Sequence, residues 1–202
     1  MDLRYVARVK ADTSVIAMIG SAGAIDAVSR ILGTLPEDLD ASVVVLIHQE
    51  PDRVSRLVEL LSERAELPVV AAEHEKDLRP GVVIVAPPGN HLLVAPGPRT
   101  ALIVSGAAPP SRPSADLLLA TLATAVGERA AAVVLSGRGH DGATGATAIH
   151  EFGGTVVATD EATSDWFSMP QATIERDTVI DHIVRLEDVA DLLGSLINSR
   201  GG

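Results

Sequence analysis

Cysteine is absent from this chain of 202 residues, which excludes both disulfide bonds and a cysteine nucleophile. Aromatic residues are also scarce, at 2% of the sequence, so Val, Ile, Leu and Ala have to build the hydrophobic core. These aliphatic residues dominate a hydrophobic fraction of 47%, which suits a parallel sheet that helices bury on both faces. The length is typical of one α/β domain and is short for two.

Basic residues are few as well. The chain has 16 Lys and Arg against 27 Asp and Glu, for a formal net charge of −11, and its only lysines are Lys10 and Lys76. Nucleic-acid partners are disfavoured, because nucleic-acid binding depends on a basic footprint. A signal-peptide pattern and an apolar run of about 18 residues are also lacking. We therefore expect a cytoplasmic protein without direct membrane insertion.

Short apolar runs alternate along the chain with segments of helical spacing. This alternation predicts a doubly wound α/β fold, with a mostly parallel sheet flanked by helices and a small β-hairpin. We expect one catalytic domain over residues 14–198, preceded by a leader or linker remnant (1–13) and followed by a tail (199–202). The expected strands are 15–19, 43–47, 69–70, 82–86, 131–135 and 155–158; the hairpin pairs 92–94 with 102–104; the helices are 24–32, 54–61, 115–126, 143–152 and 186–198.

Three polar residues, Ser21, His48 and Asp141, follow three of the expected strands. The carboxyl ends of parallel strands meet at one edge of the sheet, where open α/β folds bind ligands. There a histidine could take a serine proton while an aspartate orients the imidazole, and N–H groups at the start of a helix could face a developing oxyanion. Each residue alone also suits a structural role, such as a helix cap or a turn former. Their placement at one edge favours a serine hydrolase.

Two other kinds of site fit the sequence less well. The segment Gly20-Ser21-Ala22-Gly23 lacks the full three-glycine fingerprint of a dinucleotide site, and no acidic residue clearly stands at the ribose position. Five further histidines lack the paired spacing of a zinc site. They are His74, His91, His140, His150 and His182. We expect neither a metal nor an organic cofactor.

Several short motifs occur in a fixed order between about Val15 and Leu193. They are Ile19-Gly20-Ser21-Ala22-Gly23-Ala24, His48-Gln49-Glu50-Pro51, Pro80-Gly81, Ile84-Val85-Ala86-Pro87, His91-Leu92, Arg112-Pro113-Ser114-Ala115-Asp116, residues 135–143 (LSGRGHDGA) and Phe167-Ser168-Met169-Pro170. As an ordered set they resemble the C-terminal catalytic domain of chemotaxis protein-glutamate methylesterases, the CheB family.

This resemblance implies hydrolysis of glutamyl methyl esters, and deamidation of certain glutamines, on the cytoplasmic helices of methylated chemoreceptors. It implies that Ser21 is the nucleophile, that His48 is the general base and acid, and that Asp141 orients His48. The backbone N–H of Arg138, together with Ala22 at the start of a helix, would bind the oxyanion. The Arg112 and Arg138 side chains could offset the acidic surface and contact the substrate.

The chain departs from the family pattern at four positions, of which Ser136 in place of threonine is a mild change. Ile19 and Ala24 stand in the places of loop glycines, and the loop would have to shift if either position needed a positive φ. Arg138 replaces a methionine; it could anchor an acidic substrate, or it could pair with Asp141 and draw it away from His48. We also expect no receiver domain of the kind usual in the family, which suggests an open site or control by a separate regulatory protein.

Two alternatives keep the same scaffold. One is a serine esterase that acts on another substrate outside chemotaxis, and the other is a non-catalytic binding module. Ile19, Ala24 and Arg138 favour these alternatives, whereas the presence of Ser21, His48 and Asp141 favours a working hydrolase.

Overall fold

The chain folds around one twisted parallel sheet. A computed structural model describes residues 13–50, 54–104, 113–176 and 178–200. Seven strands form a sheet in the order β3-β4-β2-β1-β7-β8-β9, and β5 and β6 form a separate antiparallel hairpin. The predicted fold class is therefore confirmed. The strands are β1 (Ser14–Gly20), β2 (Ala41–Ile47), β3 (Val69–Ala71), β4 (Val83–Val85), β5 (His91–Ala95), β6 (Arg99–Ile103), β7 (Ala130–Val134), β8 (Thr155–Thr159) and β9 (His182–Val184).

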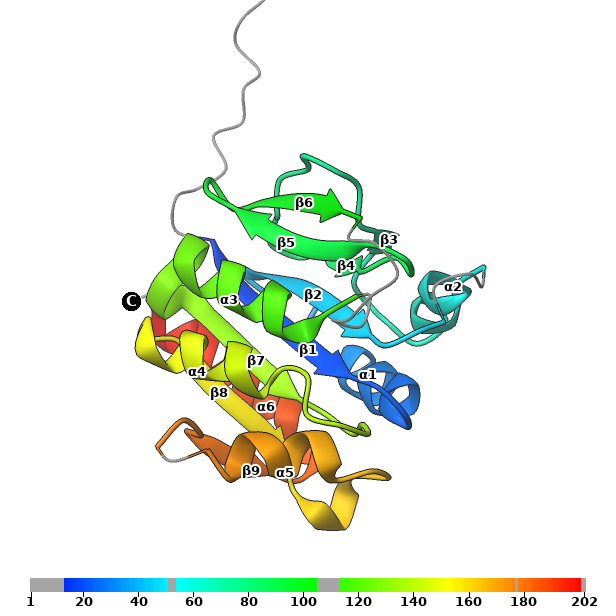
Figure 1. Cartoon of the computed structure of the whole chain (residues 1–202). Coiled ribbons are helices and arrows are strands. Elements are labelled where there is room, and N and C mark those ends of the chain that lie inside the picture. The colour runs from blue at the N-terminus through cyan, green and yellow to red at the C-terminus, as the bar shows by residue number, and fades with distance from the viewer. Residues whose placement is uncertain (1–12, 51–53, 105–112, 177, 201–202) are drawn as a thin grey trace, which may run out of the picture.

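Helices cover both faces of the sheet and make three layers. Figure 1 shows α3 and α4 in front of the strands and α6 behind them. The helices are α1 (Ala24–Leu32), α2 (Leu57–Ser62), α3 (Ala115–Val126), α4 (Ala143–Glu151), α5 (Ser168–Ile174) and α6 (Val189–Arg200). No helix in the described ranges is long and apolar enough to cross a membrane.

Alternate residues of each strand feed two separate hydrophobic cores. In β1, Ile16 and Met18 pack with α1, α2 and α6, whereas Ala17 and Ile19 pack with α3, α4 and the hairpin. Side chains of a strand point to opposite faces with a period of two residues, so each strand needs apolar residues at every position. This requirement explains the continuous aliphatic runs and the complete burial of β1, β2 and β7.

The order of the strands reverses beside β1. From β1 the chain moves to β2, and β4 and β3 extend that side of the sheet; it then returns to place β7 on the other side of β1, followed by β8 and β9. In open α/β sheets such a reversal leaves a crevice at the carboxyl ends of the central strands. The residues that follow β1, β2 and β7 therefore meet at this point.

Three of the predicted elements differ from those observed. The helix expected at 54–61 begins at Leu57, because the Ser55 hydroxyl accepts a hydrogen bond from Leu57 N–H (3.2 Å) and Val54 is exposed. The second hairpin strand runs from Arg99 to Ile103, earlier than expected, because the turn closes at Gly97 with φ 89°. The closing helix begins at Val189, after a short 3₁₀ turn, later than expected at 186.

The sequence did not predict α5 or β9. Helix α5 carries Pro170 in its first turn, where proline is tolerated because no intrahelical N–H bond is lost there. Strand β9 has three residues on the edge of the sheet and lacks a long aliphatic run. Residues 1–12 of the expected leader, Arg112 and residues 201–202 of the expected tail lie outside the described residues.

Candidate active site

Ser21 and His48 leave the sheet side by side. Strands β1 and β2 pair in parallel, and their last paired residues are Gly20 and Ile47. Ser21 therefore follows β1 next to His48, which follows β2. His48 N–H donates to the carbonyl of Gly20 (3.0 Å), and Ser21 N–H donates to the carbonyl of Ser136 on the other side (3.0 Å). The main chain at Ser21 is thus fixed between the ends of β2 and β7.

Asp141 comes to His48 from a loop 93 residues later in the chain. Its Oδ2 lies 2.8 Å from His48 Nε2, and both side chains are largely buried, with 18% and 19% of their surfaces exposed. Within the described residues the Ser21 hydroxyl makes no hydrogen bond. The structure thus brings together the three residues that sequence analysis singled out, with the Ser21 hydroxyl still available to another group.

The Asp141 carboxylate is held by the first turn of α3. It accepts hydrogen bonds from Ala115 N–H (2.8 Å), Asp116 N–H (3.0 Å) and the Ser114 hydroxyl (3.1 Å), in addition to the His48 contact. Burial acts to raise the pKa of Asp141, but the bonds from His48 and from the Asp116 and Ala115 N–H groups outweigh it. The pKa of Asp141 therefore lies below its ordinary value of 3.8, and the group stays an anion beside the imidazole.

The N-termini of α3 and α4 are each hydrogen-bonded by a carboxylate from the other segment. Asp141, just before α4, binds the N–H groups of α3, and Asp116, in the first turn of α3, accepts from Gly142 N–H (2.9 Å) and Gly145 N–H (2.8 Å) at the start of α4. Each carboxylate thus faces the positive end of the other helix. This pair fixes the Asp141 loop against α3.

Ser136 joins the Ser21 loop to a more distant segment. Its hydroxyl donates to the carbonyl of Ala22 (2.8 Å) and accepts from Trp166 N–H (2.9 Å), and the side chain is buried. From the sequence, Ser136 is only a mild replacement of threonine, and Asp116 gives no sign that it supports the site. The only signal available was the position of both residues inside family-like motifs.

The Ser21 loop accommodates its two non-glycine replacements without backbone strain. Neither Ile19 nor Ala24 has a positive φ; that conformation falls on Gly23, at φ 79°. Gly20 supplies the close approach, because a Cβ there would lie 2.4 Å from Ala24 Cβ and 3.0 Å from the Ser136 carbonyl oxygen. The loop therefore places its glycines where positive φ and tight packing demand them.

Arg138 packs on an aromatic ring. Its guanidinium carbon lies 3.7 Å from the centroid of the Trp166 ring, a cation–π contact. Asp141 is held by His48 and the start of α3, so the alternative in which Arg138 pulls Asp141 away from His48 is not what the structure shows. Ala22 lies between Ser21 and Gly23, the N-cap of α1, as expected for a donor at the start of a helix. Arg112 lies outside the described residues.

Comparison with known proteins identifies a family. The family model described as CheB methylesterase matches residues 16–193, which is most of the chain. A solved structure, the CheB methylesterase catalytic domain of Thermotoga maritima, superposes with a TM-score of 0.86 at 30% sequence identity; the match covers 91% of this chain and 98% of that one.

Curated relatives are named as methylesterases of protein glutamate. A protein-glutamate methylesterase/protein-glutamine glutaminase of Moorella thermoacetica is 35% identical over 191 residues, 93% of this chain. This chain spans 45% of that relative's length, so the two are similar over less than half of the longer protein. A putative enzyme of the same name from Leptospira interrogans is 32% identical over 85% of this chain and 89% of its own length.

Proposed function

Because this chain belongs to the CheB methylesterase family, we propose that it is a serine hydrolase of glutamyl methyl esters, and of certain glutamine amides, on chemoreceptor helices. The observation that carries the proposal is the 2.8 Å contact between His48 and an anionic Asp141, where His48 follows the strand that pairs with the one ending before Ser21. The family supplies the substrate, and the geometry supplies a base next to a nucleophile.

The reaction is acyl transfer in two steps. The Ser21 hydroxyl attacks the ester carbonyl, and its proton passes to His48, which returns it to the departing methoxide as methanol leaves. A water molecule then attacks the acyl-enzyme, again giving its proton to His48, and the glutamate carboxylate is released with the Ser21 hydroxyl restored. Asp141 contacts Nε2 of His48, which supports a mechanism in which the other ring nitrogen, Nδ1, exchanges protons with Ser21.

The oxyanion of each tetrahedral intermediate would face backbone N–H groups. Ala22 N–H belongs to the turn that opens α1, and Arg138 N–H lies in the loop between Ser136 and Asp141. Ser136 ties these two segments together, because its hydroxyl donates to the Ala22 carbonyl and its own carbonyl accepts from Ser21 N–H. Donors that are fixed in advance stabilise developing charge without reorganising during the reaction.

The direct test is methanol release from methylated chemoreceptor membranes. We expect the wild-type protein to release methanol and Ser21→Ala to release none above background. Ser195→Ala, which removes an exposed hydroxyl bonded only within α6, serves as the matched control and should keep full activity. A folded wild-type protein that releases no methanol would contradict the chemoreceptor substrate.

A further inference from the structure

The Arg138 guanidinium is an exposed cation whose donors remain available. Its guanidinium carbon lies over the Trp166 ring, 3.7 Å from the centroid, and Trp166 is itself 42% exposed. Stacking covers one face of the guanidinium and leaves the N–H groups in its plane open to an acceptor. Within the described residues Arg138 has no carboxylate partner, unlike Arg99, which pairs with Asp77 (3.2 Å), and Arg64, which pairs with Asp26 (3.4 Å).

The stacked pair is fixed to the same backbone as the nucleophile. Gly137 N–H donates to the Trp166 carbonyl (2.8 Å), and Trp166 N–H donates to the Ser136 hydroxyl (2.9 Å). The Ser136 carbonyl in turn accepts from Ser21 N–H (3.0 Å). Arg138 therefore occupies a fixed position relative to Ser21, which a side chain on a loose loop would not.

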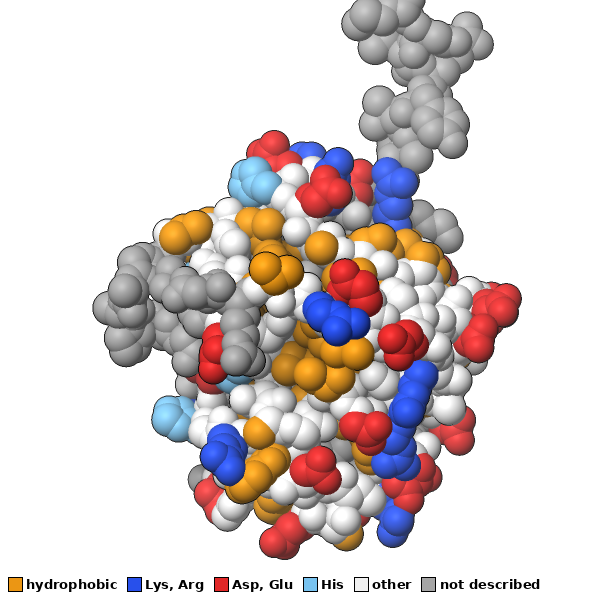
Figure 2. All heavy atoms as spheres, turned by 90° about the vertical axis from the view of Figure 1, so that its right-hand side faces the viewer, with side chains coloured by type: hydrophobic (Ala, Val, Ile, Leu, Met, Phe, Trp, Pro, Cys, Tyr) orange, Lys and Arg blue, Asp and Glu red, His pale blue; other side chains and the backbone are white. Residues whose placement is uncertain are grey.

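The molecule that carries this cation is acidic as a whole. The chain carries a net charge of −11, and Figure 2, which faces the carboxyl ends of the strands, shows Lys and Arg side chains interspersed with Asp and Glu rather than gathered in a basic patch. A negatively charged substrate is therefore repelled by the molecule as a whole. A fixed arginine at the site would offset that repulsion locally.

We propose that Arg138, held on Trp166, is a specificity-determining residue that binds a carboxylate of the substrate beside the ester under attack. The proposal rests on the proposed esterase function and names the substrate class, an ester carried on an acidic chain. A planar guanidinium suits this role because it can give a carboxylate two parallel hydrogen bonds. Trp166 holds that plane in place and thereby acts as a positioning residue.

The test compares two helical peptides that carry the same glutamyl methyl ester. One has glutamate at the flanking positions, and the other has alanine, which cannot be deamidated. The readout is the ratio of kcat/KM for the two peptides, measured by methanol release. Because each ratio is taken within one protein, any effect of a substitution on the oxyanion donors cancels.

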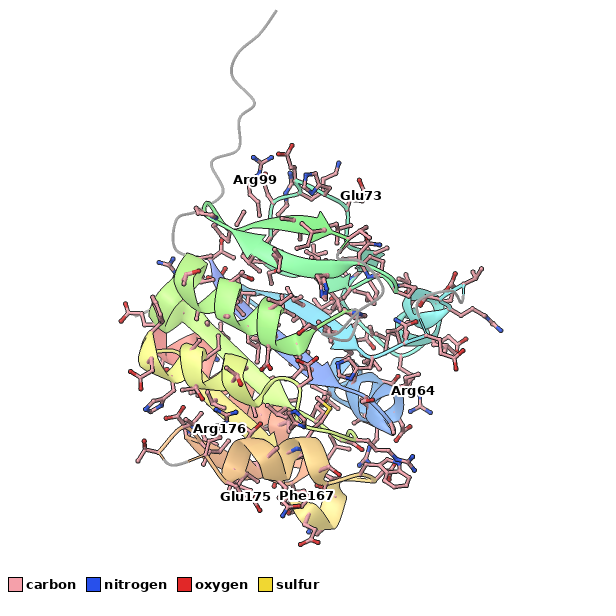
Figure 3. The ribbon with its side chains drawn as sticks, viewed as in Figure 1. Arg64, Glu73, Arg99, Phe167, Glu175 and Arg176 are labelled. Atoms are coloured by element: carbon pink, nitrogen blue, oxygen red, sulfur yellow. The ribbon has the colours of Figure 1, made fainter. Side chains whose placement is uncertain are left out.

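In Arg138→Met we expect the preference for the glutamate-flanked peptide to fall about fivefold, the upper end of what a solvent-exposed ion pair contributes. Trp166→Ala should reduce the preference as well, whereas Trp166→Phe keeps a ring under the guanidinium and should retain most of it. Arg99→Gln removes one positive charge at the opposite end of the molecule from Phe167, the neighbour of Trp166, and should leave the ratio unchanged (Figure 3).

The outcomes separate the two proposals. A wild-type protein that cleaves both peptides with a ratio that Arg138→Met does not change would overturn the role of Arg138 and leave the esterase function standing. A folded wild-type protein that cleaves neither peptide would contradict the esterase function, and the role of Arg138 with it. An equal fall of the ratio in Arg99→Gln would show a general charge effect and would also overturn the proposal.

Discussion

At the scale of single residues, the site depends on an aspartate that is kept charged. Asp141 is largely buried, yet backbone N–H groups of α3 and the His48 ring hold it as an anion. In the proposed mechanism, an anion in this place would favour one orientation of the imidazole and stabilise its protonated form during the reaction. The surrounding hydrogen bonds thus connect the ionisation of one carboxylate to both catalysis and stability.

Replacing Asp141 by Asn tests whether the charge of Asp141 supports catalysis. The amide keeps the shape but loses the charge that stabilises protonated His48, so we expect kcat for methyl-ester hydrolysis to fall by about 10³-fold or more. The measurement is steady-state methanol release at neutral pH. A fall of less than tenfold in a correctly folded variant would mean that Asp141 does not support His48 during the reaction.

The same substitution tests the pH dependence of stability. Because the folded-state pKa of Asp141 lies below its ordinary value of 3.8, its charge stabilises the fold fully above that value and ceases to do so as the pH falls through the lower, folded-state pKa. We expect the difference in unfolding free energy between wild type and Asp141→Asn to be largest near neutral pH and to shrink below pH 3.8. Urea unfolding of both proteins at several pH values measures it. A difference that grows on acidification would have the wrong sign.

At the scale of elements, two helices depend on each other's carboxylates. Asp116 accepts two N–H bonds from the start of α4, which otherwise has no side-chain cap. The exchange also sets the distance between α3 and the Asp141 loop. Stability of the helix ends and geometry of the site therefore rest on the same contacts.

Asp116→Ala should destabilise the protein by about 1–2 kcal/mol, the usual cost of losing a helix cap. It should also lower activity, because the Asp141 loop loses its anchor on α3. Urea unfolding and methanol release measure the two effects. Asp26→Ala removes an exposed carboxylate from the first turn of α1 and should cost well under 1 kcal/mol with activity retained. Equal losses in the two variants would contradict the capping role.

Two glycine-to-alanine substitutions should have opposite effects on the stability of the fold. At Gly20 a new Cβ would lie 2.4 Å from Ala24 Cβ, so Gly20→Ala must displace the Ser21 loop and should destabilise the fold. At Gly194, within α6, no atom lies within 4 Å of the position that a new Cβ would take. Gly194→Ala should therefore stabilise the helix by about 0.5–1 kcal/mol. Thermal unfolding of both variants gives the comparison. A stabilised Gly20→Ala would refute the tight packing of this loop.

At the scale of the whole molecule, the two cores share one set of strands. Each central strand contributes alternate residues to both, so neither core can form without the sheet. Trp166, the only tryptophan, lies beside the candidate site and is tied to the ends of the central strands through Ser136 and Gly137. Its fluorescence should therefore change in the same unfolding transition in which the helices are lost.

We expect urea unfolding followed by Trp166 fluorescence and by far-ultraviolet circular dichroism to give coincident midpoints, as in a cooperative two-state transition. The same experiment on Trp166→Phe, followed by circular dichroism alone, checks that the ring does not itself set the stability. A fluorescence transition at clearly lower urea would show that the site segment opens before the sheet does.

The sequence by itself determined the alternating strands and helices, the edge of the sheet at which Ser21, His48 and Asp141 meet, and the resemblance to one family. These properties are local: aliphatic runs specify buried parallel strands, and short motifs follow the strand ends. The shift of α2 and the missed β9 show the limit of that reading, because a Ser55 hydroxyl bond and an edge position carry no periodic signal.

Only the tertiary structure decided which atoms meet. The register of Gly20 with Ile47, the exchange between Asp116 and Asp141, the tie through Ser136 and the stacking of Arg138 on Trp166 each join residues at least 25 positions apart. Such contacts depend on the order of the strands and on the loops that follow them, which no local pattern of residues encodes. The tertiary fold therefore made a largely buried His48–Asp141 hydrogen bond, a supported loop and an exposed cation from residues that the sequence could only place at one edge.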